Sequence, residues 1–409
     1  MTAPRYDAIV VGARCAGSPL AMLLARRGYK VLVVDRATFP SDTVSTHVIQ
    51  PQGVAALRRW GLLDRLVATG CPPIHTYAFD FGPFAIEGSP GTADSPVAYC
   101  PRRTILDKLL VDAAAHAGAE VREGFSVDEI TQQDGRVTGI RGRAPGGQTV
   151  TETARVVIGA DGRHSLVARA VSPDEYNQKP PLVAAYYAYW SGLPMAGRFE
   201  TTIGPGSGFA AAETHDGLTV LVGGWPYARF DERKGDVERH YMALFAATPM
   251  EARLAGARRE SKIFGAVSPN FFRKPYGPGW ALVGDAGYTK DPITAQGISD
   301  SFRDAELLAG ALDGGWSGRL DDTAALADYQ EVRDQVLPMY EFTAQVASME
   351  PPPPELQQLL AAVHGNQDAM DDFVSVVAAT VSPVEFFDPG NIGKIMAMRD
   401  ADVTDAVSA

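Results

Sequence analysis

The chain has 409 residues, of which 45% are hydrophobic and 21% are charged, so a disordered or fibrous protein is excluded and two or three globular domains are expected. The formal net charge of −12 argues against a nucleic-acid partner, because neutralising a phosphate backbone needs a basic surface. Three cysteines without a Cys-x-x-Cys pair exclude a disulfide scaffold and a structural zinc site, and no metal centre is predicted. We find no secretory signal and no apolar run long enough for a transmembrane segment, and therefore expect a cytoplasmic protein.

The chain opens with a predicted strand, helix and second strand. Residues 6–11 are typical of a buried parallel strand, residues 18–27 favour a helix, and residues 30–34 form a second apolar strand. The first turn reads Gly12-Ala-Arg14-Cys-Ala-Gly17, which is the dinucleotide-binding pattern G-x-G-x-x-G with Arg14 in place of the middle glycine. This unit predicts a site for the ADP part of a dinucleotide. Arg14 either places its charge on the phosphates or points away from them.

Carboxylates follow this second strand and two later strands. Asp35, with Arg36 after it, ends the second strand and is placed to bind ribose hydroxyls. A strand at 156–158 leads to Asp161-Gly162, and a strand at 280–283 leads to Gly284-Asp285. A carboxylate at a strand end can accept hydrogen bonds from vicinal hydroxyls, and the helix predicted after Gly297-Ile298 offers free N–H groups to an anionic oxygen.

In their order and separation, these three motifs resemble those of the class A flavoprotein monooxygenases with the para-hydroxybenzoate hydroxylase fold, which are related to the geranylgeranyl reductases and the flavin-dependent halogenases. The resemblance covers about residues 5–345. It implies an α/β fold with a discontinuous Rossmann-like FAD-binding domain, an inserted antiparallel β-sheet domain for the substrate and a C-terminal helical segment. The expected bounds are 1–75, 98–180 and 273–345 for FAD, 76–97 and 181–272 for the substrate, and 346–409 for the tail.

The resemblance also implies which residues bind FAD. Arg103, at the start of a predicted helix, matches an arginine that approaches the FAD diphosphate in that family, although a solvated arginine would give the same pattern. The backbone of Val127 would contact adenine. The cofactor-binding residues expected are Gly12, Arg14, Gly17, Asp35, Arg36, Arg103, Val127, Asp161, Gly162, Gly284, Asp285, Gly297 and Ile298.

His47 is the candidate catalytic residue. Family members pass this segment beside the flavin ring, so His47 can hydrogen bond to flavin or substrate, or transfer a proton near neutral pH. A histidine bonded to its own loop is the competing interpretation. Aromatic strands between residues 180 and 272 can present a surface to a flat or lipophilic substrate, although core packing is the commoner role of any single aromatic residue. The substrate-binding residues expected are Tyr187, Tyr189, Trp190, Phe209, Trp225 and Pro292.

Together these features predict an FAD-dependent monooxygenase that acts through a flavin C4a-hydroperoxide on an aromatic or lipophilic small molecule, with O₂ as co-substrate. We find no second dinucleotide motif, so electrons would come from transient NAD(P)H docking or from a separate flavin reductase. The Trp-x-Trp-x-Ile-Pro segment of the halogenases is absent, which disfavours halogenation.

Two other functions stay open. Pro292-Ile-Thr-Ala-Gln-Gly297 is closer to the corresponding segment of the reductases, which keeps a flavin-dependent reductase or dehydrogenase as an alternative. A non-catalytic flavin-binding protein is the third possibility. A monomer or a homodimer is expected.

Overall fold

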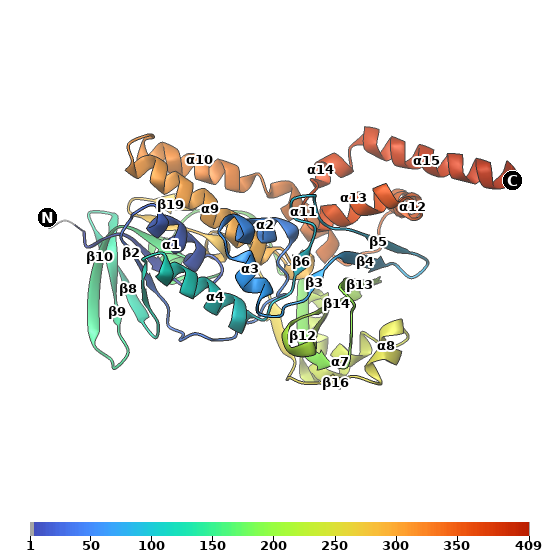
Figure 1. Ribbon diagram of the computed structural model, residues 1–409, viewed down its shortest axis with the longest axis horizontal. Coiled ribbons are helices and arrows are strands. Elements are labelled where there is room, and N and C mark those ends of the chain that lie inside the picture. The colour runs from blue at the N-terminus through green and yellow to red at the C-terminus, as the bar shows by residue number, and fades with distance from the viewer. Residues whose placement is uncertain (1–3, 409) are drawn as a thin grey trace.

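A mainly parallel sheet forms the end of the molecule that carries the N-terminus (Figure 1). The structure is a computed structural model that describes residues 4–408, with side chains to residue 398. The sheet has eight strands in the order β19-β20-β10-β1-β2-β7, and β8 and β9 form an antiparallel extension beside β10. Its strands are β1 Tyr6–Val11, β2 Val31–Val34, β7 Glu120–Arg122, β8 Ser126–Gln133, β9 Arg136–Arg143, β10 Thr149–Gly159, β19 Tyr276–Gly277 and β20 Trp280–Leu282.

Both faces of this sheet are buried, which explains why its central strands are apolar throughout. Along β1, Ala8 and Val10 face a core shared with α1, α4 and α9, whereas Ile9 and Val11 face a core shared with α5 and β8–β9. The helices concerned are α1 Gly17–Arg26, α4 Arg103–His116, α5 Leu166–Val171 and α9 Gly297–Trp316.

The register of the parallel strands brings four strand ends to one edge of the sheet. Val11 lies opposite Val34 of β2 and Gly159 of β10, and Gly159 in turn lies opposite Leu282 of β20. The segments that follow these residues therefore leave the sheet side by side. We name this border, formed by the ends of β1, β2, β10 and β20, the carboxyl edge.

A second sheet of eight strands is built largely from the middle of the chain. Its order is β16-β12-β15-β14-β13-β4-β5, with β17 beside β12. Neighbouring strands run antiparallel, as expected, except β13 and β4, which are parallel. β4 enters from the N-terminal part of the chain and not through a hairpin with β13, which leaves its direction free. The strands are β4 Thr76–Asp80, β5 Ala85–Gly88, β12 Val183–Ser191, β13 Arg198–Gly204, β14 Ser207–Glu213, β15 Leu218–Pro226, β16 Arg258–Arg259 and β17 Phe264–Val267.

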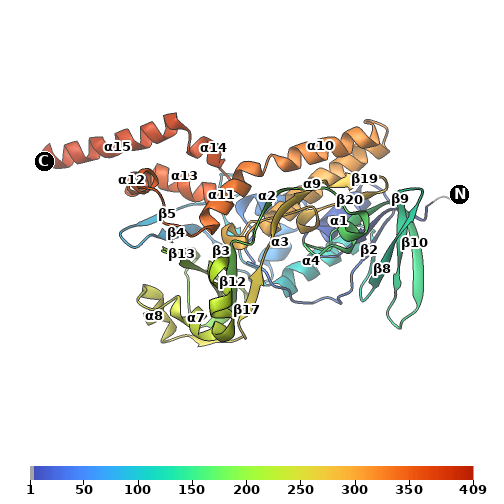
Figure 2. The same ribbon diagram turned by 180° about the vertical axis from the view of Figure 1, so that it is seen from behind.

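Helices cover this second sheet on both faces (Figure 2). On one face lie α7 Val237–Ala243 and α8 Pro249–Leu254, and on the other lie α12 Pro354–Val363 and α13 Gln367–Val377. The other helices are α2 Pro51–Arg59, α3 Leu63–Val67, α6 Phe230–Arg233, α10 Asp322–Asp334, α11 Leu337–Ala347, α14 Pro383–Phe386 and α15 Pro389–Ser408. Short pairings join the two parts through β3 Pro73–Ile74 with β6 Ala98–Tyr99, and through β11 Glu175–Lys179, β18 Asn270–Arg273 and β21 Tyr288–Thr289.

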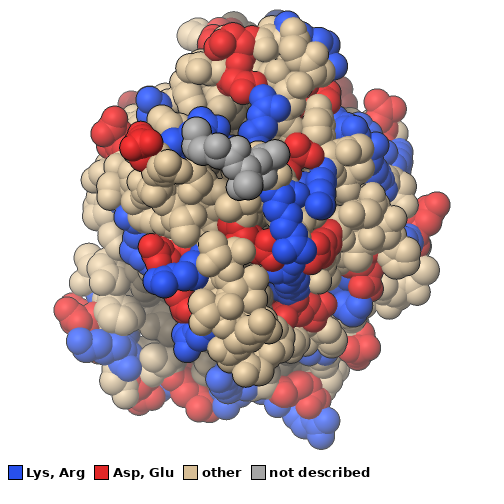
Figure 3. All heavy atoms as spheres, turned by 90° about the vertical axis from the view of Figure 1, so that its left-hand side faces the viewer, with Lys and Arg blue, Asp and Glu red and all other residues tan. Residues whose placement is uncertain are grey.

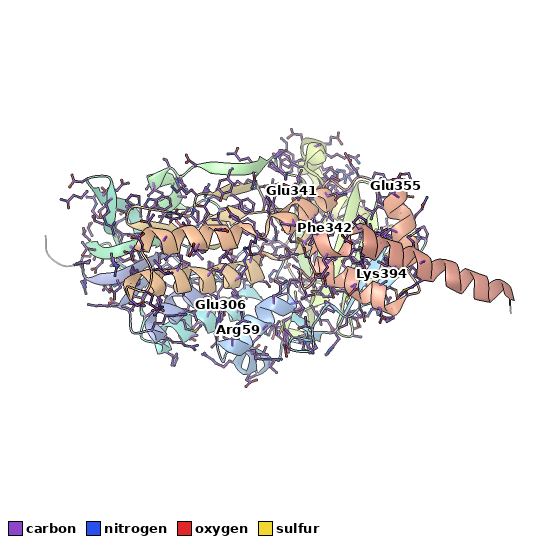
Figure 4. The ribbon with its side chains drawn as sticks, turned by 90° about the horizontal axis from the view of Figure 1, so that it is seen from above. Arg59, Glu306, Glu341, Phe342, Glu355 and Lys394 are labelled. Atoms are coloured by element: carbon purple, nitrogen blue, oxygen red, sulfur yellow. The ribbon has the colours of Figure 1, made fainter. Side chains whose placement is uncertain are left out.

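Long helices connect the two sheets. Seen from above, α9 and α10 run beside each other and α15 extends away from the body (Figure 4). Glu306 of α9 forms an ion pair with Arg59 of α2, with 2.6 Å between Oε2 and Nη2. The two side chains are labelled in Figure 4. The predicted α/β fold, with a Rossmann-like part, a second sheet and a helical tail, is confirmed.

The surface carries charges of both signs. On the face shown in Figure 3, Lys and Arg side chains are interspersed with Asp and Glu side chains and form no broad single-sign area. Between residues 4 and 408, no helix is both long enough and apolar enough to cross a bilayer.

Candidate active site

Two glycines shape the turn at the head of the carboxyl edge. Gly12 has a φ of +105°, and a Cβ placed there would lie 2.4 Å from the carbonyl oxygen of Ala160. A Cβ on Gly17 would lie 1.8 Å from the carbonyl oxygen of Gly12. Neither neighbour is a flexible side chain, so both positions require glycine, and the turn places the amino end of α1 directly at the sheet edge.

Asp35 ties this turn to the end of β2. Its Oδ2 accepts a hydrogen bond from the N–H of Ala13 at 2.8 Å, and its Oδ1 accepts one from the N–H of Ala37 at 2.8 Å. The carboxylate is half-buried and keeps lone pairs for a hydroxyl group. Of the other residues expected on this side, Arg36 is exposed, and Val127 of β8 is half-buried with its side chain against the core beneath the sheet.

A buried carboxylate, Asp107, holds two arginines beside the turn. Arg103, the first residue of α4, pairs with Asp107 one helical turn later at 2.9 Å between Nη2 and Oδ1. Arg14 donates to the same carboxylate through Nη1. The side chain of Arg14 therefore points toward Asp107 of α4 and not into solvent. The sequence analysis missed Asp107, although its spacing of four residues from Arg103 on a helix was a usable signal.

Asp161 and Gly162 follow β10 at the same edge. The Asp161 carboxylate accepts a hydrogen bond through Oδ2 from the N–H of Leu166 at 2.6 Å. Its Oδ1 is buried and finds no partner in the described part of the chain. Burial raises the pKa of this carboxyl above its usual range. Gly162 has a φ of +78°, which turns the chain toward α5.

Asp285 follows Gly284 at the end of β20, on the same edge. Solvent reaches its side chain, yet the surrounding protein raises the pKa of this carboxyl to about 6, an effect that Arg163 and Arg103 partly oppose. Gly284 precedes it with a φ of +59°.

The amino end of α9 opens on the same side. Gly297 is exposed, and no described atom lies within 4 Å of the position where its Cβ would stand, whereas Ile298 next to it is buried. The first N–H groups of this 20-residue helix thus meet open space. Pro292 begins the short turn of residues 292–294 before the helix and is half-buried.

His47 is fully buried and has a φ of +67°, which few residues other than glycine adopt. Its Nε2 lies 2.7 Å from the hydroxyl of Tyr189, while its Nδ1 is buried and has no partner among residues 4–398. Burial, with a smaller effect from the charge of Arg103, lowers the pKa of His47 to about 3. The imidazole is therefore neutral near pH 7, which favours hydrogen bonding over the expected proton transfer at that pH.

The aromatic residues expected to bind substrate divide between the two faces of the second sheet. Tyr187 and Tyr189 alternate with Trp190 along β12, so they point to the His47 side and Trp190 points away. Phe209 and Trp225 share the opposite face with Trp190, where α7 and α8 cover them. The prediction of one aromatic surface is corrected: only the two tyrosines accompany His47.

Two buried polar residues, Gln50 and Asp291, escaped the sequence analysis. Gln50 accepts a hydrogen bond through Oε1 from the Tyr77 hydroxyl at 2.5 Å and donates one through Nε2 to the carbonyl oxygen of Thr294 at 3.2 Å. Asp291 accepts one from the N–H of Val183 at 3.1 Å, and burial raises the pKa of its carboxyl to about 7. Only the position of Asp291 directly before a proline, as the cap of a turn, gave a local signal.

Comparison with known proteins shows which proteins this chain resembles. Residues 5–186 match the family model described as an FAD binding domain. Over most of its length the chain is similar to flavin-dependent reductases, halogenases and monooxygenases. The digeranylgeranylglycerophospholipid reductase of Methanocella arvoryzae is 27% identical over 320 residues, which cover 74% of this chain and 76% of that reductase.

Solved structures of low sequence identity share the fold of this chain. The myxobacterial chondrochloren halogenase CndH has a TM-score of 0.78 at 21% identity, with 96% of each chain covered. PqsL of Pseudomonas aeruginosa has a TM-score of 0.70 at 20% identity, with 92% of this chain and 100% of PqsL covered. The similar proteins are reductases, halogenases and monooxygenases, and this chain is likewise an enzyme of the oxidoreductase class.

The carboxyl edge fits FAD. A dinucleotide presents diphosphate oxygens, hydroxyl groups and a flat heterocycle, which need a tight turn, acceptor carboxylates and open helix N–H groups. The edge supplies the Gly12–Gly17 turn, the orphaned Oδ1 of Asp161, the accessible Asp285 and the open amino end of α9. All of them lie along one border, so a single extended ligand can meet them.

Proposed function

We propose that this flavoprotein is a monooxygenase that hydroxylates an aromatic or lipophilic small molecule, with NAD(P)H as the source of electrons. The coarser assignment, an FAD-binding oxidoreductase of the monooxygenase, halogenase and reductase superfamily, rests on the family match. The finer one rests on the surroundings of His47. We place the protein in the cytoplasm as part of this proposal.

The residues of the carboxyl edge would hold the cofactor. In this proposal Asp35 accepts the ribose hydroxyls, Arg103 and the Gly12–Gly17 turn meet the diphosphate, and Asp285 accepts hydroxyls of the ribityl chain. Gly297 and Ile298 would turn backbone N–H groups toward the pyrimidine end of the flavin. Bound FAD supplies the electron transfer and the activation of O₂, and the protein supplies binding, orientation and exclusion of water.

One observation carries the choice of hydroxylation: the unpartnered Nδ1 of His47. The ring of His47 packs edge-on against Tyr187 and Tyr189, which belong to the apolar cluster that also contains Val48, Ala295 and Met339. The Tyr189 hydroxyl occupies Nε2, so the other ring nitrogen is free for a ligand. An unactivated alkene cannot form a hydrogen bond with Nδ1, whereas a phenol hydroxyl or a ring N–H can. A buried polar atom without a partner is costly, so a substrate that pairs with it gains affinity and a fixed orientation.

Reduction of a carbon–carbon double bond is the second candidate. It is favoured by the relative from Methanocella arvoryzae, a reductase that aligns over three quarters of its own length. The loop from Pro292 to Gly297 supports it as well. Both hydroxylation and double-bond reduction need a site that excludes water, so the apolar surroundings do not distinguish the two reactions.

The experiment that separates them compares aerobic and anaerobic turnover. The holoprotein is mixed with NADH or NADPH and with phenol, 2-naphthol or 4-hydroxyquinoline, and O₂ consumption and products are followed. The proposal expects O₂ uptake that depends on the aromatic compound and matches a hydroxylated product one to one. Anaerobic saturation of an isoprenoid alkene, with no uptake of O₂ in the presence of the aromatic compounds, would contradict it.

A further inference from the structure

A buried ion pair lies beside the amino end of α9. Lys290 directly follows β21, and 5% of its side chain is exposed. Its Nζ lies 2.8 Å from Oδ2 of Asp300, the fourth residue of α9. The same Nζ donates to Oε1 of Gln296 at 2.5 Å, and Gln296 is the residue directly before the helix. Neither the proposed contacts with FAD nor the surroundings of His47 involve this lysine.

Both members of this pair are charged. Burial opposes ionisation of Asp300, but the charges of Lys290 and Arg303 outweigh it and hold the pKa of this carboxyl below its usual range. The Tyr288 hydroxyl donates to the same Oδ2 at 2.7 Å, which also favours the ionised form. Burial lowers the pKa of Lys290, and the ionised carboxylate beside it opposes that effect and favours the ammonium form. Arg303 lies 3.5 Å from Asp300 but pairs more closely with Asp304, at 2.6 Å, so those two charges balance each other.

The direction of the pair matches the dipole of the helix. The peptide dipoles of an α-helix place partial positive charge at its amino end. The ammonium of Lys290 lies against Gln296, before the first turn, whereas the carboxylate of Asp300 belongs to the end of that turn. The pair therefore adds positive potential at the amino end of α9, where Gly297 is exposed. Because the pair is buried, salt and water screen it little.

Positive potential at this place favours the reduced form of a flavin. Uptake of two electrons and one proton leaves the pyrimidine end of a flavin with one negative charge, and a fixed cation nearby stabilises that charge. We propose that Lys290 is a positioning residue that raises the reduction potential of bound FAD through Gln296 and the first turn of α9. It acts from behind the helix end, without a contact to the cofactor. The inference rests on the proposed placement of the flavin at α9 and not on hydroxylation.

The test measures the reduction potential of FAD in the holoprotein, by anaerobic titration with dithionite in the presence of a reference dye and without substrate. Lys290→Met should weaken the binding of reduced FAD about tenfold relative to oxidised FAD, which lowers the potential of a two-electron couple by ~30 mV. Asp300→Asn leaves the charge of Lys290 unopposed and should raise the potential by a similar amount. Lys290→Arg keeps the charge and should stay nearest to the wild type.

Shifts of opposite sign separate an electrostatic role from a merely structural one, because damage to the fold would move both potentials in the same direction. Lys234→Met is the matched control. It breaks an exposed pair, 2.7 Å from Nζ to Oδ1 of Asp231, and should leave the potential unchanged. Asp300→Asn keeps Lys290 beside Gln296, so it stays informative if Lys290→Met does not fold.

Shifts in the same direction, or wild-type potentials in both Lys290→Met and Asp300→Asn, would overturn the proposal. The titration contains no substrate, so a failure of the proposed hydroxylation would leave its result unchanged. An FAD affinity that is unchanged in Gly297→Ala would contradict the placement of the flavin at α9, and with it this proposal.

Discussion

The carboxyl edge of the first sheet and the His47 side of the second sheet hold polar groups in opposite ways. At the edge, Arg14, Arg103 and Asp107 are charged and neutralise one another only in part. Beside the second sheet, His47 and Tyr189 are both neutral, because burial lowers the pKa of the histidine and raises that of the tyrosine. The first arrangement suits a charged ligand, and the second suits an uncharged one. In the proposed function these two regions are the cofactor side and the substrate side, and they differ in electrostatics.

The largest effect is expected at Gly17, compared with Gly297. In Gly17→Ala the new Cβ would stand 1.8 Å from a backbone oxygen, so the turn must open, and we expect a loss of more than about 3 kcal/mol of stability. In Gly297→Ala no described atom obstructs the methyl group. Its melting temperature should match the wild type, while FAD affinity falls because the methyl group would stand beside the proposed contact between the amino end of α9 and the flavin. Unfolding titrations and FAD binding on both variants check this pair.

Asp285→Ala should weaken FAD binding about 100-fold or more, since it removes a carboxylate that accepts two hydroxyl groups. The matched control is Asp174→Ala, which removes an exposed carboxylate outside the carboxyl edge. Fluorescence titration of the apoprotein with FAD measures both. Equal FAD affinities for the two variants would remove Asp285 from the cofactor site.

On the second sheet, the two faces of β12 predict different outcomes. His47→Asn keeps a residue that tolerates positive φ but is too short to reach Tyr189, and should lower substrate-dependent O₂ consumption about 100-fold. Tyr189→Phe should lower it about 10-fold. FAD affinity should change less than twofold in both.

Trp190→Phe is the control on the opposite face of β12. It should cost about 1–3 kcal/mol of stability through lost packing near Tyr241 and leave turnover unchanged. Steady-state rates measure the turnover of this variant, and denaturant unfolding measures its stability. Loss of turnover in Trp190→Phe with normal turnover in His47→Asn would reverse the assignment of the faces.

The smallest effect concerns pH. The pKa of Asp285 is about 6, and only the ionised carboxylate accepts hydrogen bonds from two hydroxyls. FAD affinity should therefore be constant above about pH 7 and fall as pH drops through 6, by up to about tenfold per unit. Titrations between pH 5 and 8 check it, and Asp285→Asn should lose the pH dependence. A wild-type affinity that rises toward low pH would contradict this account.

The difference between the two sides also shows what the sequence could predict. Gly12, Asp161 and Gly284 were recognisable because strand, turn and helix are local, and the parallel register then places their ends together. Arg14 was recognised as a departure from the pattern, but its direction depends on Asp107 and Ser41, which lie outside that unit. The residues next to Arg14 in the sequence do not predict these distant partners.

The substrate side depended on tertiary packing and was predicted less well. Tyr187 and Trp190 look equivalent as aromatic residues, and only the alternation of side chains along β12 with the placement of α7 and α13 assigns them to different faces. The low pKa of His47 follows from its complete burial and from the charges of Arg103 and Arg102, which no short motif around His47 reports.

Oxygen labelling tests the central claim most directly. The holoprotein is incubated with NAD(P)H, a phenol that it accepts as substrate and ¹⁸O₂, and the mass of the product is determined by mass spectrometry. A monooxygenase predicts one ¹⁸O atom in each molecule of hydroxylated product and none from H₂¹⁸O. Product without the label, or saturation of a double bond with no oxygen added, would contradict the account.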